Sequence, residues 1–157
     1  MSNEDELGLV ADEERAAGDS TEQRECEELI IQSVGALAGF ELRKVRLPLP
    51  NGGHLEVDGC DASRSVLCEA WAHQGRVRPA QKSKVVMDAA KLFLAGQVLG
   101  TNPRKIIAFA DTVPAKWFRG RSWMAELLKA MNIEVLVVEL PPELRARVCA
   151  AQERQYR

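Results

Sequence analysis

The chain has 157 residues, 46% of them hydrophobic, which suits a single domain with enough apolar material for a sizeable core. No run approaches the roughly 18 apolar residues that a membrane span needs, and the acidic start does not fit a secretory signal. Four scattered cysteines without a CxxC pair, together with only two histidines, argue against structural zinc. We therefore expect a cytoplasmic protein with reduced thiols.

The net charge of −2 hides an uneven distribution of charge along the chain. Residues 1–28 hold 11 of the 23 acidic side chains and two of the 21 basic ones, so the rest carries 19 basic against 12 acidic, a net +7. A positive body suits an anionic partner, although the same side chains would also serve solubility alone. We expect nucleic acid as the partner, DNA ahead of RNA, and no membrane; a homodimer or larger assembly stays open.

The predicted elements follow an acidic segment, residues 1–20, which has no sustained apolar period and is expected to be a disordered tail. Helical spacing of apolar residues predicts an amphipathic helix over 21–38, which Gly39 ends. Alternating patterns and the turn signals between them then predict an antiparallel meander of three strands, over residues 40–50, 53–61 and 65–73.

The second half of the chain alternates helices and strands. We expect a helix between Pro79 and Gly100, then a buried strand, a helix, a strand and a charged helix over residues 105–111, 115–131, 133–140 and roughly 143–155. The order α-βββ-α-β-α-β-α predicts an α/β fold with a mixed central sheet, an antiparallel meander plus parallel strands, flanked by helices. Residues 21–157 would form this single domain.

Two acidic residues stand in the middle of the second and third predicted strands, in LEVDG and VLCEAW. Asp58 and Glu69 are about equally far from the turn between these strands, so they should face each other. Like charges opposite each other destabilise a sheet unless they are compensated, and Mg²⁺ takes one or two carboxylates beside water and phosphate. Alternation puts Asp58 on the face opposite Val57 and Glu69 beside Leu67 and Trp71. We favour a metal pair over a solvated pair, which stays the alternative.

With these residues the chain resembles the PD-(D/E)xK, or restriction-endonuclease-like, nucleases, whose αβββαβ core carries Asp on the second strand and Glu-x-Lys on the third. Residues 21–111 cover that core. The resemblance implies Mg²⁺ or Mn²⁺ at Asp58 and Glu69, with the Ala70 carbonyl as a further ligand, and phosphodiester hydrolysis by a metal-activated water. The chain departs from the pattern at Trp71, which stands where the family has Lys.

Members of this superfamily can carry the lysine on the following helix, where Lys82 and Lys84 are the candidates. At about 100° per residue, Lys82 lies about 30° and Lys84 about 130° from the centre of the apolar face, which slightly favours Lys82. Both are kept as catalytic candidates, although surface lysines are common. Together with Arg76 and Arg78 they form a basic run suited to phosphate contacts.

Three further residues lie beside the same site as auxiliary candidates. His73 could shuttle protons, although an exposed histidine at a strand end is the commoner case; Gln74 or Gln81 could hold a water or a phosphate. We expect a magnesium-dependent nuclease, a hydrolase. The alternatives are a degenerate module of the same fold that binds nucleic acid or a protein, and a small-molecule enzyme on an unrelated α/β sheet. The second lacks a Gly-rich phosphate loop and a GxSxG motif.

Overall fold

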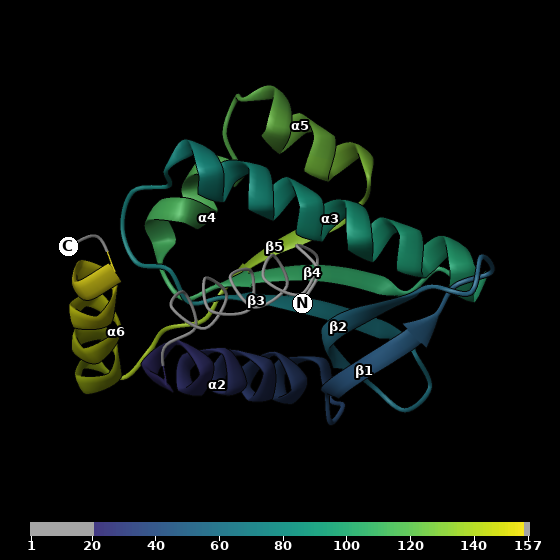
Figure 1. Cartoon of the computed structure of the whole chain (residues 1–157), viewed down its shortest axis with the longest axis horizontal. Helices are drawn as coiled ribbons and strands as arrows, with labels where there is room; N and C mark the ends of the chain where they lie inside the picture. The colour runs from purple at the N-terminus through teal and green to yellow at the C-terminus, as the bar shows by residue number, and fades with distance from the viewer. Residues whose placement is uncertain (1–20, 156–157) are drawn as a thin grey trace, which may run out of the picture.

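The computed structural model describes residues 21–155 as three layers, with helices on both faces of one sheet (Figure 1). The expectation for the acidic segment 1–20 lies outside the described residues. The first half of the fold consists of α2 (Thr21–Ala38), β1 (Arg43–Pro48), β2 (His54–Cys60) and β3 (Val66–Trp71). The second half consists of α3 (Pro79–Leu99), β4 (Arg104–Phe109), α4 (Thr112–Phe118), α5 (Trp123–Ala130), β5 (Ile133–Val137) and α6 (Pro142–Gln155).

The five strands lie side by side in the order β1-β2-β3-β4-β5. The first three pair antiparallel and the last three pair parallel, so the predicted mixed α/β sheet is confirmed. One core lies between the sheet and the helices α3, α4 and α5, and a second lies between the sheet and the helices α2 and α6 (Figure 1). The central strands β3 and β4 are covered on both faces, which explains their nearly continuous apolar sequences.

One predicted element is wrong, because the helix expected over 115–131 is two helices. The side chain of Ser122 accepts a hydrogen bond from Ala125 N at 3.1 Å and so starts α5 afresh. Trp123, the first residue of α5, fits the helical spacing but is 67% exposed, so apolar periodicity across the break was misleading. Asp111 caps α4 by accepting a hydrogen bond from Val113 N at 3.2 Å.

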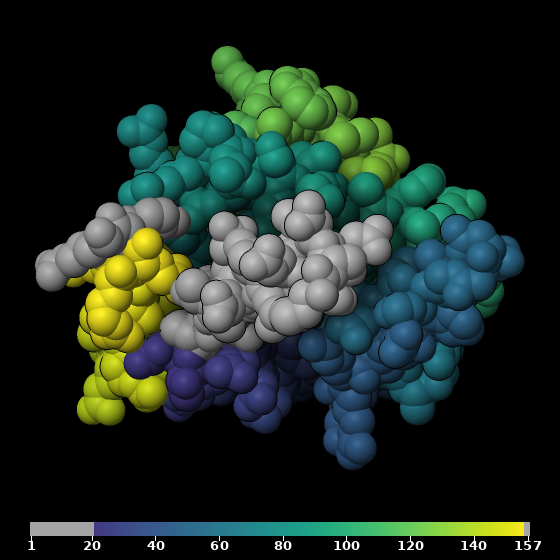
Figure 2. Space-filling model, in the orientation of Figure 1, coloured from purple at the N-terminus to yellow at the C-terminus, as the bar shows by residue number. Residues whose placement is uncertain are grey.

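The C-terminal helix α6 returns to pack against the start of α2, as the contact between the yellow and purple surfaces in Figure 2 shows. Two exposed ion pairs cross this contact, Arg147 with Glu25 at 2.8 Å and Arg154 with Glu22 at 3.4 Å. Exposed pairs contribute little, so apolar residues such as the buried Val148 hold α6 in place. Of the helices described, none has both the length and the apolar character that crossing a membrane would require.

Candidate active site

A bulge in β2 decides where Asp58 points. The pairing of β1 with β2 slips by one residue, with the extra residue on β2. Both Val57 and Cys60 therefore contribute to the core under α3, and Asp58, which has the parity of Cys60, also faces α3. The expectation that Asp58 lies on the face opposite Val57 is wrong for this reason. Bulges re-aim side chains in this way and are frequent beside active sites.

The register of β2 and β3 places Asp58 opposite Glu69, as the spacing of the two residues predicted. The paired residues of these strands are Gly59 with Cys68 and Cys60 with Leu67, and the pairing ends before Asp58. Beyond this point the Asp58 side chain replaces the backbone pairing, because its Oδ2 accepts a hydrogen bond from Ala70 N at 3.0 Å. The amide and carbonyl of one strand residue point to the same neighbouring strand. The Ala70 carbonyl is therefore directed into the opening between β2 and β3.

Glu69 is a buried acid, with 2% of its surface exposed. Its Oε1 lies against Nζ of Lys91, a residue of α3. Beyond this ion pair, Oε1 has no hydrogen-bond donor within the described residues. Burial, a hydrogen bond to Asp58 and the charge of Asp58 raise the pKa of Glu69 to about 10, against the opposing effect of Lys91. An added cation would favour the ionised form of this buried carboxyl group.

A third acid, Asp88 of α3, completes the cluster. Asp88 Oδ2 accepts a hydrogen bond from Trp71 Nε1 at 3.1 Å, and its Oδ1 lies 4.0 Å from Lys91 Nζ. Burial raises the pKa of Asp88, although Lys91 and the Trp71 hydrogen bond lower it. Burial alone would lower the pKa of Lys91, but Glu69, Asp88 and Asp58 together raise it. Lys91 is therefore held as a cation among three carboxyl groups.

Lys91, rather than Lys82 or Lys84, contacts the carboxyl group of Glu69. The ammonium group of Lys82 lies 4.2 Å from the centre of the Trp117 ring, and that of Lys84 lies 5.7 Å from the centre of the Trp71 ring. Seven residues, 72–78, separate β3 from α3, so the first turns of the helix lie beyond the end of the strand. From there α3 runs back over the sheet and advances only about 1.5 Å per residue, against about 3.3 Å per residue for a strand. Several helical residues are therefore needed to return as far as Glu69, and a later turn of α3 covers it.

The auxiliary candidates hold the connection between β3 and α3 in shape. His73 Nδ1 accepts from Gln81 Nε2 at 3.0 Å and its Nε2 donates to Arg76 O at 3.3 Å, while burial lowers the His73 pKa. Gln74 is buried and donates to the carbonyls of Ala72 and Ala110, both at 3.1 Å. These side chains are thus engaged within the protein. Arg76 and Arg78 are exposed on the same connection.

No protein-family model, no curated protein and no solved structure matches this chain. Among residues 21–155, no three His, Cys, Asp or Glu side chains form a group that could hold a metal ion. Asp88 and Lys91 were not among the predicted site residues. Their signal was present, because Lys84, Asp88 and Lys91 follow one another at the four- and three-residue spacing of one helix face.

Proposed function

We propose that this chain is a metal-dependent phosphodiesterase of the PD-(D/E)xK type that cleaves nucleic acid, with DNA ahead of RNA as its substrate. The observation that carries the proposal is the facing pair of Asp58 and Glu69, with Lys91 against the buried acid. The succession of α2, β1, β2, β3, α3 and β4 also has the αβββαβ order that the resemblance implies. Lys91 then takes the part of the family's lysine from the following helix, in place of the Trp71 position.

The donor atoms at the site suit a hard divalent cation such as Mg²⁺ or Mn²⁺. Asp58 and Glu69 supply carboxylate oxygens and Ala70 a carbonyl oxygen directed into the same opening, which are ligand types that Mg²⁺ accepts. The buried Oε1 of Glu69 has the ammonium group of Lys91 as its one cationic neighbour, and a divalent cation would add positive charge at the same carboxyl group. A bound cation would supply a water of lowered pKa and stabilise negative charge on the phosphate.

Asp58, Lys91 and Lys84 then have different roles at the site. The Ala70 amide fixes the Asp58 carboxylate by its hydrogen bond, so this acid is oriented before a ligand arrives. Lys91 keeps its proton, because the surrounding carboxyl groups raise its pKa. Its ammonium group can therefore orient a water and stabilise the charge that grows on a phosphate. Lys84, with its ammonium group over Trp71, lies at the rim where the backbone of a nucleic acid would pass.

A catalytically degenerate module of the same fold, binding nucleic acid or a protein partner, is the second candidate. It is favoured by the replacement of lysine by Trp71 and by the absence, within residues 21–155, of a three-residue metal group. In that case Lys91 would serve as a permanent substitute for the cation beside Glu69. The two candidates share the fold and the basic surface but differ in whether the site binds metal.

Metal binding and cleavage together test the proposal. Because a ligand that binds only the native state stabilises it, Mn²⁺ or Mg²⁺ should raise the melting temperature of the wild-type protein and not that of Asp58→Ala. Single- and double-stranded DNA and RNA, incubated with either metal, should show metal-dependent cleavage that Asp58→Ala abolishes. Nucleic-acid binding without a metal response or cleavage would support the degenerate module instead.

A further inference from the structure

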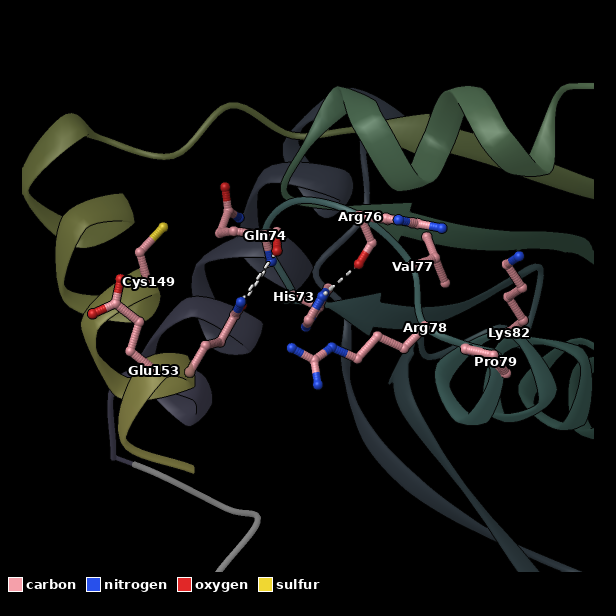
Figure 3. Close-up of a pocket in the computed structure, with 10 residues that line it drawn as sticks. His73, Gln74, Arg76, Val77, Arg78, Pro79, Lys82, Cys149 and Glu153 are labelled. Carbon is pink, nitrogen blue, oxygen red and sulfur yellow. Dashed lines mark hydrogen bonds between the residues drawn. The ribbon is translucent and has the colours of Figure 1, made fainter. Parts of the chain in front are cut away.

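A cavity of about 580 Å³ lies between α6, the β3–α3 connection and the start of α3 (Figure 3). Its volume falls in the range of sites that take small ligands, roughly 300–1,000 Å³. Three cations line it, Arg76, Arg78 and Lys82, against a single acid, Glu153. The apolar side chains of Val77 and Pro79 form part of the wall. Such a lining suits a ligand that combines an anionic group with an apolar or aromatic body.

The loop that carries the arginines is fixed before any ligand binds. Gln74 N donates to Gln152 Oε1 at 2.7 Å, and Gln152 Nε2 donates back to Gln74 O at 3.1 Å, so α6 clamps the loop (Figure 3). On its other side, Gly75 N donates to Asp111 Oδ2 at 2.6 Å. A positive φ of 82° at Gly75, which favours glycine, makes this tight course possible. A pre-organised loop loses little conformational entropy when it binds a ligand.

The cationic side chains that line the cavity differ in the contacts that they already make within the protein. In Figure 3 the guanidinium group of Arg78 extends from the loop toward α6. Lys82 also rests on the Trp117 ring at 4.2 Å. Within residues 21–155, the side chain of Arg76 makes no hydrogen bond or ion pair. Arg76 is therefore the cation best suited to an incoming anion, because it gives up no internal partner.

The position of the cavity relates it to the carboxylate pair. His73, at its lining, follows Glu69 by four residues, which is at most about 14 Å along the chain. This span corresponds to about four nucleotides at the roughly 3.4 Å rise of a duplex strand. On the far side, α6 closes the cavity with Cys149, Gln152 and Glu153. The cavity therefore lies within about four nucleotides' length of Glu69, and α6 lines one side of it.

We propose that this cavity binds the phosphomonoester end of a nucleic-acid strand, so that the site at Asp58 and Glu69 acts near strand ends. The inference rests on the proposed function, and it names the form of the substrate. The cationic side chains at the loop would bind the terminal phosphate, and the apolar wall would contact the last nucleotide. A free mononucleotide offers the same phosphomonoester, so the experiment has to separate the two sources.

The test is fluorescence anisotropy in EDTA with one labelled oligonucleotide in three forms, carrying a 5′-phosphate, a 3′-phosphate or neither. One phosphorylated form should bind about tenfold more tightly than the unphosphorylated form, and Arg76→Ala should remove most of this difference. Arg76→Glu should reverse it. Arg121→Ala, which removes the same charge from the α4–α5 connection outside the cavity, should keep the difference.

Each result bears on the cavity separately from the cleavage proposal. Equal binding of all three forms, or a phosphate preference that survives Arg76→Glu, would overturn the assignment. Binding of a nucleoside monophosphate at the cavity without any preference for phosphorylated ends would overturn the strand-end form of it. Phosphate-dependent binding through Arg76 in a protein that cleaves nothing would leave the cavity assignment standing and refute the nuclease. Thermal unfolding confirms that each variant is folded.

Discussion

Lys91 on α3 reaches the buried carboxyl group of Glu69 on β3, 22 positions earlier in the sequence. The contact joins an acid that burial would neutralise to a cation that the surrounding acids hold in its charged form. Removing Lys91 would leave the buried Oε1 of Glu69 without the donor that it contacts. Burying the pair therefore costs folding free energy, but it holds an ammonium group and a carboxyl group together where they can act on a ligand.

The first prediction concerns the coupling of these two residues. Lys91→Met should lower the free energy of unfolding by about 1–3 kcal/mol, because the buried Oε1 of Glu69 loses the donor that it contacts. In a Glu69→Gln background, where no acid needs a partner, the same substitution should cost less. A double-mutant cycle by urea denaturation would measure a coupling on the order of 0.5–3 kcal/mol. Additive effects of the two substitutions would contradict the ion pair, and Lys129→Met, at an exposed lysine of α5, is the control.

The second prediction concerns the pH dependence of stability without metal. Burial and then Asp58 raise the pKa of Glu69 from the ordinary 4.5 to about 10. The unfolded chain releases this proton above pH 4.5 while the folded chain keeps it, so the stabilisation is full below pH 4.5 and is lost as the pH rises toward 10. The slope is at most about 1.4 kcal/mol per pH unit. Glu69→Gln should flatten it, and an unchanged slope in urea denaturation would refute the raised pKa.

The third prediction concerns the turn between β2 and β3. Asp61 accepts hydrogen bonds from Ser65 N at 2.7 Å, Val66 N at 2.9 Å and the Ser63 hydroxyl at 2.8 Å. Burial raises its pKa, but the hydrogen bonds, led by that of the Ser65 hydroxyl, lower it to about 2. Its stabilisation is therefore present above pH 3.8 and lost as the pH falls toward 2. Asp61→Ala should lower the free energy of unfolding by about 2 kcal/mol or more at neutral pH. It should also make the stability fall less as the pH is lowered, and calorimetry at several pH values measures both effects.

The fourth prediction separates two tryptophans. Trp71→Phe should cost about 1–2 kcal/mol, because Asp88 loses the donor 3.1 Å away and stays half-buried. Trp123→Phe, at a residue 67% exposed, should leave the stability nearly unchanged. Chemical denaturation of the two variants makes the comparison. Equal effects would mean that the Trp71–Asp88 hydrogen bond does not hold the cluster.

Most of the fold follows from sequence patterns because the relevant signals are local. Apolar periods, Gly and Pro turns and the buried run at β4 predicted the mixed sheet and the order of its elements. The break between α4 and α5 was missed, because it depends on Ser122 capping a new helix while the apolar period continues past it. A serine cap predicts that a new helix starts, whereas a continuing apolar period predicts one unbroken helix. Only the packing of the folded chain decides between the two.

The site was predictable where it depends on strand register and not where it depends on three-dimensional packing. Equal spacing from a turn placed Asp58 opposite Glu69. The bulge that turns Asp58 toward α3 arises from the pairing of β2 with β1, which alternation along β2 alone does not reveal. Likewise, the choice of Lys91 over Lys82 or Lys84 depends on the length of the 72–78 connection and on how α3 crosses the sheet. Helical angle alone compared Lys82 with Lys84 and gave no reason to consider Lys91.

The central claim, that Asp58, Glu69 and Lys91 form a hydrolytic centre, is tested most directly by single-turnover cleavage of DNA by Lys91→Met in the presence of Mg²⁺ or Mn²⁺. Loss of transition-state stabilisation should slow cleavage about a hundredfold or more, while DNA affinity changes only a few-fold and Lys129→Met cleaves like the wild type. Cleavage by Lys91→Met at the wild-type rate would contradict the account, as would a wild-type protein that binds DNA and cleaves it with neither metal.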